Sequence, residues 1–219
     1  MDEETQNRDS QTGSGLPAGR KPRDYLIFAI DFIIATGMIL TIAVAIQTDR
    51  IMREDLLMHA RFASAGIDTT KVSALSGSPA DLASPIYQEI KIQLAEVRAA
   101  DPDLRFAYLI GQRPDGMYFF YADSEPPDSA DYSPPGQEYT EATPLIINGY
   151  SRGQAMTDGP ASDRWGTWVS AVVPVNDQAG RRLAVFGIDE DARDWFRQIV
   201  IACPSPSCRK RSTKAGWDF

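Results

Sequence analysis

The chain has 219 residues, of which 43% are hydrophobic and 10% aromatic, enough to build the core of one ordinary domain with attached segments. Its formal net charge is −8, and the part from Gln47 to Val200 alone holds 23 acidic and 14 basic side chains. This negative balance argues against a nucleic-acid-binding surface. Cys203 and Cys208 both lie near the C-terminus, so no disulfide framework holds the middle of the chain.

The first long element is apolar. Residues 25–46 read YLIFAIDFIIATGMILTIAVAI, and a helix of this length can cross a hydrocarbon core of roughly 30 Å. Arg20, Lys21 and Arg23 precede it, whereas basic and acidic residues mix after it, so the positive-inside rule places the N-terminus in the cytoplasm and the acidic middle outside. The alternative is a cleavable signal peptide, but its apolar region is usually only about 7–15 residues long.

Asp31 lies inside this apolar segment, where a charge at the bilayer centre can cost about 2.5–3.5 kcal/mol. Two interpretations stay open. The carboxyl group either reaches the interface or is protonated, or it makes a helix–helix contact in a dimer.

Polar and helical patterns surround the span. Residues 1–24 are rich in Gly, Ser, Asp and Gln, which predicts a disordered cytoplasmic tail. The stretch Thr48–Ile67 repeats apolar residues at helical spacing without proline, so we expect the membrane helix to continue outside. Residues 68–82 read as a loop. A second helix is expected to begin at Ser84-Pro85, as N-cap and first helical residue, and to stop at Asp101.

The pattern then changes to that of strands. Residues 106–112 and 117–123 flank Arg-Pro-Asp-Gly, which predicts a hairpin, and the proline-rich segment 124–139 predicts a long loop. The remaining expected elements are a short helix over 140–149, a short strand over Gln154–Thr157, a second hairpin with strands 165–175 and 181–189, and a closing helix over Glu190–Val200. Because few long crossovers fit between the strands, we predict an antiparallel sheet and the α+β class.

Alternation in strand 165–175 places four small apolar side chains on one face, suited to packing on the long helix: Val169, Ala171, Val173 and Val175. The other face carries Trp168, Ser170 and Val172, and in the earlier hairpin Tyr121 and Asp123 share a face. Aromatic rings with a few polar groups are typical of small-ligand pockets. The same pattern also fits a second core layer under the proline-rich loop, and both interpretations stay open.

Sets of catalytic residues are missing from the sequence. His59 is the only histidine and lies just outside the membrane, so we expect no Ser-His-Asp triad and, with the two tail cysteines, no zinc site. No phosphate-binding glycine loop and no HExxH motif occurs, and we predict no catalytic residue, metal or cofactor. Asp189, Glu190 and Asp191 cluster at the end of a predicted strand. They could form a metal site or an acid/base pair, but we favour the interpretation that they are acids in the first turn of a helix.

Several segments together resemble a known group. They are the long helix after the span, FAYLIGQRPDGMYFFYADSEP, SPPGQEY, GPASDRWGTWVSAVVPVNDQAG and AVFGIDEDARDW. In this order they are similar to the Cache/PDC extracytoplasmic sensor domains, the PAS-like input modules of bacterial and archaeal membrane histidine kinases, diguanylate cyclases and chemoreceptors. The resemblance covers about residues 25–200. It implies a transmembrane helix that continues into a long helix packed on a PAS-like antiparallel sheet of about five strands.

The resemblance also implies a site. In such domains the ligand lies between one sheet face and the loop and short helix that cover it, so the loop 124–139 is the expected lid. The candidate ligand-binding residues are Tyr108, Tyr121, Asp123, Tyr139, Trp168 and Ser170, with Arg105 near the rim. Asp189 corresponds to the Gly-hydrophobic-Asp that ends the last strand in this group, which we interpret as structural. The arginine-containing amino-acid signature of double-Cache receptors is missing, so no ligand identity is carried over.

Four segments are therefore predicted: a cytoplasmic tail (1–24), a transmembrane helix (25–46), a Cache/PDC-like sensor domain (47–200) and an irregular tail (201–219). Relatives usually return through a second membrane helix into a signalling module, whereas this tail is basic and not apolar. We expect a chain truncated or frameshifted near residue 200, with a stand-alone module that signals through partners as the alternative.

The sequence thus predicts a single-pass protein of the inner or plasma membrane that is not an enzyme. It is expected to bind a small ligand outside, as a homodimer, and to relay binding through the transmembrane helix. One alternative is an anchored protein-interaction module, whose 168/170 face would be filled by its own side chains without a cavity. The other is an anchored hydrolase that uses the carboxylates of 189–191.

Overall fold

The structure is a computed structural model that describes residues 22–201. It divides into two units, the second of which begins at Val44. One helix, α1 (Pro22–Ala65), forms the described part of the first unit and the beginning of the second. Helix α1 begins inside the predicted tail 1–24, while the rest of that tail and residues 202–219, with both cysteines, lie outside the described residues.

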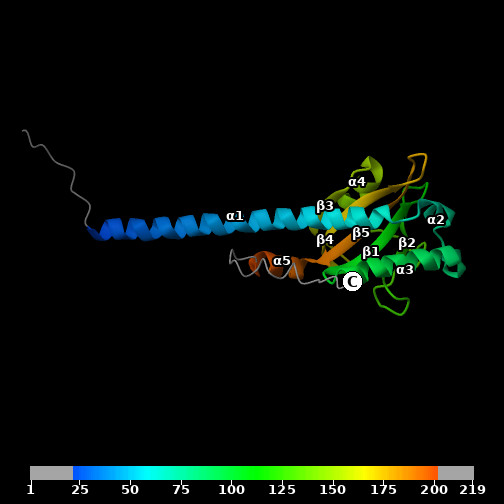
Figure 1. Ribbon diagram of the computed structural model, residues 1–219, viewed down its shortest axis with the longest axis horizontal. Helices are drawn as coiled ribbons and strands as arrows, with labels where there is room; N and C mark the ends of the chain where they lie inside the picture. Colours follow the sequence, from blue (N-terminus) through cyan, green and yellow to red (C-terminus); the bar gives the residue numbers. More distant parts are fainter. Residues whose placement is uncertain (1–21, 202–219) are drawn as a thin grey trace, which may run out of the picture. The chain divides into compact units, whose positions relative to one another are not determined.

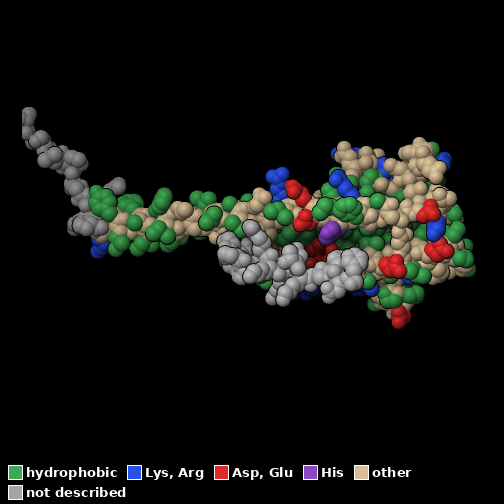
Figure 2. Space-filling view, in the orientation of Figure 1, with side chains coloured by type: hydrophobic (Ala, Val, Ile, Leu, Met, Phe, Trp, Pro, Cys, Tyr) green, Lys and Arg blue, Asp and Glu red, His purple; other side chains and the backbone are tan. Residues whose placement is uncertain are grey.

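The first unit is an apolar helix. It is part of α1, which is the one helix among the described residues that is long and apolar enough to cross a membrane. The mean hydropathy of the most apolar window of this helix is 2.4. Hydrophobic side chains are exposed along it (Figure 2), as expected of a helix surrounded by lipid. The Thr41 hydroxyl donates to the Gly37 carbonyl at 2.9 Å, so this polar group is satisfied within the helix.

Two short helices correct the predicted loop 68–82. Helix α2 (Thr69–Ala74) begins at Asp68, whose carboxylate accepts hydrogen bonds from two backbone amides of the first turn. A 3₁₀ helix, η1 (Pro79–Ala83), begins with a capping box that involves the Asp81 carboxylate. These capping side chains stabilise single turns that are too short to produce a hydrophobic period.

The second predicted helix is confirmed. Helix α3 (Pro85–Ala100) has Ser84 at its N-cap position and proline at its first turn. Tyr87, Ile90 and Leu94 recur at helical spacing and are buried, which directs one face of α3 into the core.

Five antiparallel strands form one sheet: β1 (Leu104–Gln112), β2 (Tyr118–Asp123), β3 (Met156–Asp163), β4 (Gly166–Asn176) and β5 (Arg182–Asp191). Their order is β2-β1-β5-β4-β3, so the last strand lies in the centre. Both predicted hairpins are present, and the α+β class with an antiparallel sheet of about five strands is confirmed. Strand β3 is longer than the predicted Gln154–Thr157 because residues as far as Asp163 pair with β4.

Two helix boundaries differ from the prediction. Helix α4 (Pro144–Arg152) begins four residues later than the predicted 140–149, because Thr143 caps it and the proline follows at its first position. The closing helix α5 (Ala192–Ile201) begins two residues later than predicted, because β5 extends through Asp191.

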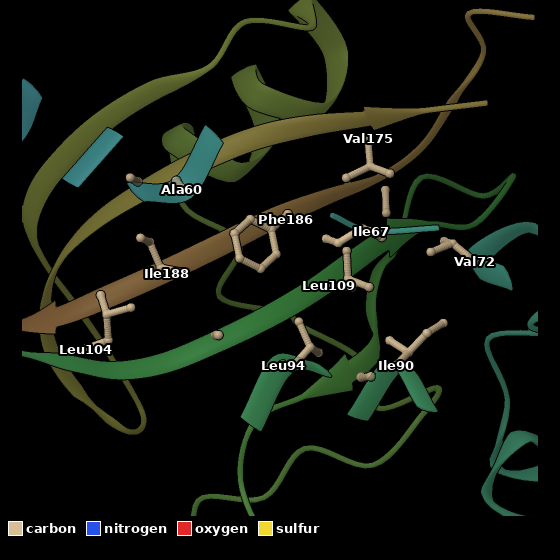
Figure 3. Close-up of a cluster of buried hydrophobic side chains, with 14 of the residues drawn as sticks. Ala60, Ile67, Val72, Ile90, Leu94, Leu104, Leu109, Val175, Phe186 and Ile188 are labelled. Carbon is tan, nitrogen blue, oxygen red and sulfur yellow. The ribbon is translucent and has the colours of Figure 1, made fainter. Parts of the chain in front are cut away.

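Side chains alternate across the sheet and create two buried clusters. The first contains side chains of α1, α2, α3 and α5 together with Val169, Ala171 and Phe186, and Figure 3 shows Phe186 in its middle with Ala60 and Leu109 nearby. The second contains the aromatic side chains of the opposite face and residues of α4. Helices α4 and α3 accordingly lie on different sides of the sheet (Figure 1). The predicted packing of the apolar face of β4 on the long helix is confirmed.

Candidate functional site

Two cavities lie on the aromatic face of the sheet, between the strands, the segment 124–139 and α4. Their volumes are about 30 and 80 Å³. Four side chains line both cavities: Tyr108, Tyr139, Asp163 and Asp189. The smaller cavity also touches Asp131 and Ser133 of the segment 124–139, and the larger one is closed by the first turn of α4. A polar site of this size has room for water or a small ligand.

Asp189 is the central carboxylate of the site. It lies on β5 and is 5% exposed. It accepts a hydrogen bond from the Tyr108 hydroxyl at 3.0 Å and another from the side chain of Ser170, its cross-strand neighbour on β4. Burial raises the pKa of Asp189 to about 7, with a further contribution from the nearby Asp163 carboxylate. The group therefore changes its charge near neutral pH.

A glycine determines how Tyr108 reaches Asp189. Gly187 is the cross-strand neighbour of Tyr108. A β-carbon at residue 187 would collide with the Tyr108 ring, so only glycine lets this ring lie over β5. The hydroxyl then reaches the carboxylate two residues further along the strand.

Asp163 is the second carboxylate of the site and ends β3. Its Oδ1 accepts hydrogen bonds from the Trp165 and Gly166 backbone amides at 2.9 and 3.2 Å and from Trp168 Nε1 at 2.9 Å. Its Oδ2 accepts a long bond of 3.4 Å from the Tyr139 hydroxyl. Asp163 thus shapes the β3–β4 turn and holds two aromatic side chains of the site in place.

Aromatic rings form much of the wall. Phe120, Tyr139 and Trp165 are in mutual contact, with ring centroids 5.3, 5.7 and 5.9 Å apart. Tyr108 contacts Phe120 edge-to-face at 6.1 Å. Such tilted and edge-to-face pairs are the favourable geometries for aromatic side chains, so the wall is a packed surface.

Buried charges attach the segment 124–139 to α3. Lys91 Nζ is buried and donates to the Asp123 carbonyl at 3.2 Å, to the Asp123 carboxylate at 3.0 Å and to the Glu125 carbonyl. The other Asp123 carboxylate oxygen accepts from the Ser133 amide at 2.7 Å. Burial raises the pKa of Asp123, although the Ser133 amide and Lys91 oppose that rise. One ion pair therefore contacts both the start of the segment and its middle at Ser133.

A second ion-pair group lies beside it. The buried Glu125 carboxylate accepts from Arg98 of α3, from Arg105 of β1 and from the Ser129 hydroxyl. The Arg105 guanidinium also donates to Asp131 at 2.6 Å. The segment 124–139 is thus held by charge-assisted hydrogen bonds at several points.

Five of the seven candidate residues lie together. Tyr108, Asp123 and Tyr139 line the smaller cavity, and Trp168 and Ser170 join Tyr108 and Tyr139 around the larger one. Their roles as ligand-binding residues remain a prediction, but they do share one site.

The other two candidates lie elsewhere. Tyr121 packs against the cluster of the helix-covered face, opposite the cavities, and contacts Phe119. Arg105 lines neither cavity, and its guanidinium is occupied by Glu125 and Asp131. The prediction that Tyr121 and Asp123 share a face is wrong. The pairing of β1 with β2 shifts register between Leu109 and Ile110 and leaves Tyr121 without a cross-strand partner, so alternation is interrupted there and Asp123, not Tyr121, faces the cavities.

Sequence reasoning missed Asp163 and interpreted Asp189 as structural. Asp163 was not a candidate because it is the last residue of β3, and this strand was predicted to stop at residue 157. Asp189 carried a signal: strict alternation along β5 puts it on the same face as Val185 and Gly187 and opposite Ser170, which was itself a candidate.

The three consecutive acids at the end of β5 do not converge. Asp189 lines the cavities, whereas Glu190 is buried on the other face, where burial and then Asp103 and Asp101 raise its pKa to about 8. Asp191 pairs with Arg193. They belong to the strand and not to the first turn of a helix.

Within residues 22–201, no group of three or more His, Cys, Asp or Glu side chains is arranged to hold a metal ion.

Comparisons with known proteins find similarity only to solved structures, at low sequence identity. No protein-family model and no curated protein matches the chain. Among solved structures, it is similar to the sensory domain of the Campylobacter jejuni chemoreceptor Tlp3, with a TM-score of 0.40, 10% identity and coverage of 74% of this chain and 69% of that one. The ligand-binding domain of Tlp3 in complex with L-valine gives a TM-score of 0.38, 9% identity and coverage of 74% and 68%.

A GAF sensor protein from Burkholderia vietnamiensis gives a TM-score of 0.35 and 14% identity, and the match covers 66% of this chain and 83% of that one. These similar structures are a chemoreceptor sensory domain, its ligand-binding domain in complex with L-valine, and a GAF sensor protein.

Proposed function

We propose that this chain is a membrane-anchored extracytoplasmic sensor that binds a small molecule in the two cavities and relays binding through α1. The N-terminus lies in the cytoplasm and α1 crosses the inner or plasma membrane once, in accordance with the basic residues before the span. The observation that carries the proposal is the pair of cavities itself, lined by aromatic rings and carboxylates on the sheet face that α1 does not cover.

The position of the sheet supports the relay, because the cavities lie on one face of the sheet and α1 packs on the other. On β5, Asp189 faces the cavities while its neighbour Ile188 packs in the cluster that includes Leu56 and Ala60 of α1. Because β5 and α1 contribute to the same buried cluster, a displacement of β5 by a ligand reaches α1 through the side chains of this cluster.

A hydrogen bond gives a second connection. Arg53 Nη2 of α1 donates to the Gly159 carbonyl of β3 at 2.9 Å, beside Asp158, which lines the larger cavity. The same guanidinium donates to Asp49 at 2.8 Å, and Asp49 accepts from Trp195 Nε1 of α5 at 2.9 Å. A ligand shifts this arrangement only if it binds two positions of α1 with different affinity.

We further propose that the sensor is a homodimer in which α1 faces its copy. Beyond the predicted span 25–46, three large apolar side chains are exposed on α1 at helical spacing, Ile51 at 48%, Met58 at 45% and Phe62 at 72%. They lie on the side of the helix opposite to the buried Leu56 and Ala60. Two anchored copies share one orientation in the membrane, which favours pairing of these stripes.

The test is a thermal-shift screen of the full-length chain in lipid nanodiscs against organic acids, amino acids, amines and divalent metals. A ligand at 100-fold its dissociation constant adds about 2.7 kcal/mol to the free energy of unfolding. The hit is then measured on Ser170→Leu, whose side chain fills the larger cavity, and on Thr167→Leu, an exposed position of the same strand outside both cavities.

We expect the ligand-induced shift to disappear in Ser170→Leu and to persist in Thr167→Leu. A shift that survives in both variants places the ligand elsewhere and contradicts the proposed site. A cooperative melt that responds to no compound favours the anchored protein-interaction module.

A further inference from the structure

We propose that the cavities bind a small organic cation, an amine or methylated ammonium that carries no carboxylate. This inference rests on the proposed function, because it names the ligand class of the same site. Three properties of the site support it: the charges that line it, the rings that surround it and its volume.

The charges are all of one sign. Four carboxylates line the smaller cavity, those of Asp123, Asp131, Asp163 and Asp189, and no Lys, Arg or His of the described chain lines either cavity. Two of the four have cationic partners, since Asp123 pairs with Lys91 and Asp131 with Arg105.

The other two carboxylates have only neutral donors. Asp163 accepts from backbone amides, an indole and a phenol, and Asp189 accepts from Tyr108 and Ser170. A buried carboxylate without a positive partner is costly, and a cationic ligand supplies that partner. An anion would add another negative charge. A free amino acid would bring a carboxylate that finds no basic side chain in either cavity.

The rings suit the same ligand. Tyr108 and Tyr139 line both cavities, Trp168 lines the larger one, and Phe120 and Trp165 line the smaller one. A cation within about 6 Å of a ring centroid is attracted by the negative face of the ring, most strongly by tryptophan, and methylated ammonium groups use such surroundings. Carboxylates behind aromatic rings add charge to this attraction.

The volume limits the ligand's size. One water-sized atom needs about 10–15 Å³ of cavity measured in this way, so the larger cavity of 80 Å³ holds about six non-hydrogen atoms. Isobutylamine has about this size, and its carbon skeleton is shared by compounds of other charge.

Ligand binding is coupled to a proton. The titratable groups that line the cavities with Asp189 are Tyr108 of β1, Asp158 and Asp163 of β3, Tyr139, and Asp123 and Asp131. Burial raises the pKa of both tyrosines, which stay neutral. Because the pKa of Asp189 is about 7 without ligand, a cation that requires its charged form should bind about tenfold more tightly at pH 8 than at pH 6.

The experiment titrates the full-length chain in nanodiscs with four probes of one skeleton: isobutylamine, isobutanol, isovalerate and L-valine. Fluorescence of Trp165 and Trp168, which line the cavities, reports binding, and the melting temperature reports it independently. We expect isobutylamine to bind at least tenfold more tightly than the other three, with the stated rise from pH 6 to pH 8.

Two variants locate the effect. Asp189→Asn keeps the size of the side chain but removes its charge, and we expect at least a tenfold loss of isobutylamine affinity and loss of the pH dependence. Asp191→Asn is the matched control on the same strand; it lines neither cavity and should stay within twofold. If Asp189→Asn fails to fold, Trp168→Leu, which changes a ring of the larger cavity, replaces it, with an expected loss of about threefold to tenfold.

Tighter binding of isovalerate, L-valine or isobutanol than of isobutylamine would overturn the cation inference and leave the small-molecule sensor standing. Equal affinity of wild type and Asp189→Asn for isobutylamine would also overturn it. If none of the four probes binds at millimolar concentration, the inference is wrong, and the cavity-blocking screen with Ser170→Leu decides the proposed function separately.

Discussion

Gly187 and Asp189 show how two residues of one strand build the centre of the site. Gly187 leaves room for the Tyr108 ring, and Asp189 receives the hydroxyl of that ring. Tyr108 is buried and contacts Phe120, so its ring cannot move aside without disturbing the neighbouring aromatic wall.

Replacing Gly187 by alanine should therefore destabilise the fold. Overpacking of a well-packed core costs about 1–3 kcal/mol, and we expect the melting temperature of Gly187→Ala to fall by several degrees. Gly66→Ala is the control, because a β-carbon there meets only ordinary contacts on an exposed surface. Equal melting temperatures for the two variants would contradict the packing of Tyr108 over β5.

The two buried acids of β5 predict how stability depends on pH. Burial raises the pKa of Asp189 to about 7 and that of Glu190 to about 8, so the folded chain holds two protons that the unfolded chain releases near pH 4. Each contribution is complete below pH 4 and is lost as the pH rises toward 7 or 8. It amounts to on the order of 4 kcal/mol per group.

We expect the melting temperature to fall between pH 5 and pH 8. The double variant Asp189→Asn/Glu190→Gln should flatten this slope and be more stable than wild type at pH 8. Circular dichroism melts across this range provide the measurement. A wild-type melting temperature that rises steadily from pH 5 to pH 8 would show that these carboxyl groups are ionised in the fold.

For single residues, the sequence predicted the face of the sheet on which a side chain lies more reliably than the contacts that the side chain makes. Alternation placed Trp168 and Ser170 correctly on the cavity side. It could not reveal that Asp189 lacks a positive partner, because the charges around a buried group come from strands far apart in the chain. Arg105 illustrates the converse: its partners Glu125 and Asp131 depend on the course of an irregular segment.

Among the elements, the segment 124–139 contributes Asp131, Ser133 and Tyr139 to the wall of the smaller cavity. It has no regular secondary structure, yet Lys91 of α3 contacts both Asp123 and Glu125 at its start and lies 4.3 Å from the Tyr132 ring centroid. Polar side chains therefore hold its first part, whereas backbone hydrogen bonds between residues 136–139 and β2 hold its end.

Lys91→Met should release this segment. Removing one partner of a buried ion pair leaves the other uncompensated and costs about 3–5 kcal/mol. We expect a lower melting temperature and faster proteolysis within 124–139 than in wild type. Lys71→Met, which removes an exposed ion pair with Glu89, is the control and should change neither property. Unchanged proteolysis in Lys91→Met would mean that the segment is held by other contacts.

The exposed stripe on α1 gives the prediction for association. A charge placed in a paired apolar interface is unfavourable, so Met58→Glu/Phe62→Glu should shift the chain from dimer to monomer in detergent. Light scattering after size-exclusion chromatography measures the change. Leu82→Glu/Ile92→Glu replaces similarly exposed apolar residues elsewhere and should leave the dimer intact. A wild-type monomer at all concentrations would contradict the proposed pairing.

Long elements with a clear period were predictable, and short capped ones were not. The hairpins and α3 follow from alternation, turn residues and proline at a helix start. Helix α2 and η1 depend on the side chains of Asp68, Ser78 and Asp81, and single turns carry no period. The sequence of β3, MTDGPASD, contains Gly159-Pro160 and few apolar residues, so its length is determined by pairing with β4 and not by an apolar pattern.

In the second unit as a whole, the sheet separates the cavities from the helices of the other face. One face holds the carboxylates and rings of the cavities, and the other packs on the part of α1 that begins at Val44. Strands β1, β4 and β5 contribute to both faces, so occupation of the cavities and the position of α1 are linked by rigid elements. This arrangement supports sensing by displacement.

Hydrogen exchange of the full-length chain in nanodiscs, with and without saturating isobutylamine, tests this account most directly. We predict slower exchange in 124–139 and at the end of β5, together with altered exchange in the turn of α1 around Arg53 and at the start of α5. The same protection without any change in α1 and α5 would contradict the relay, and identical exchange throughout would contradict binding itself.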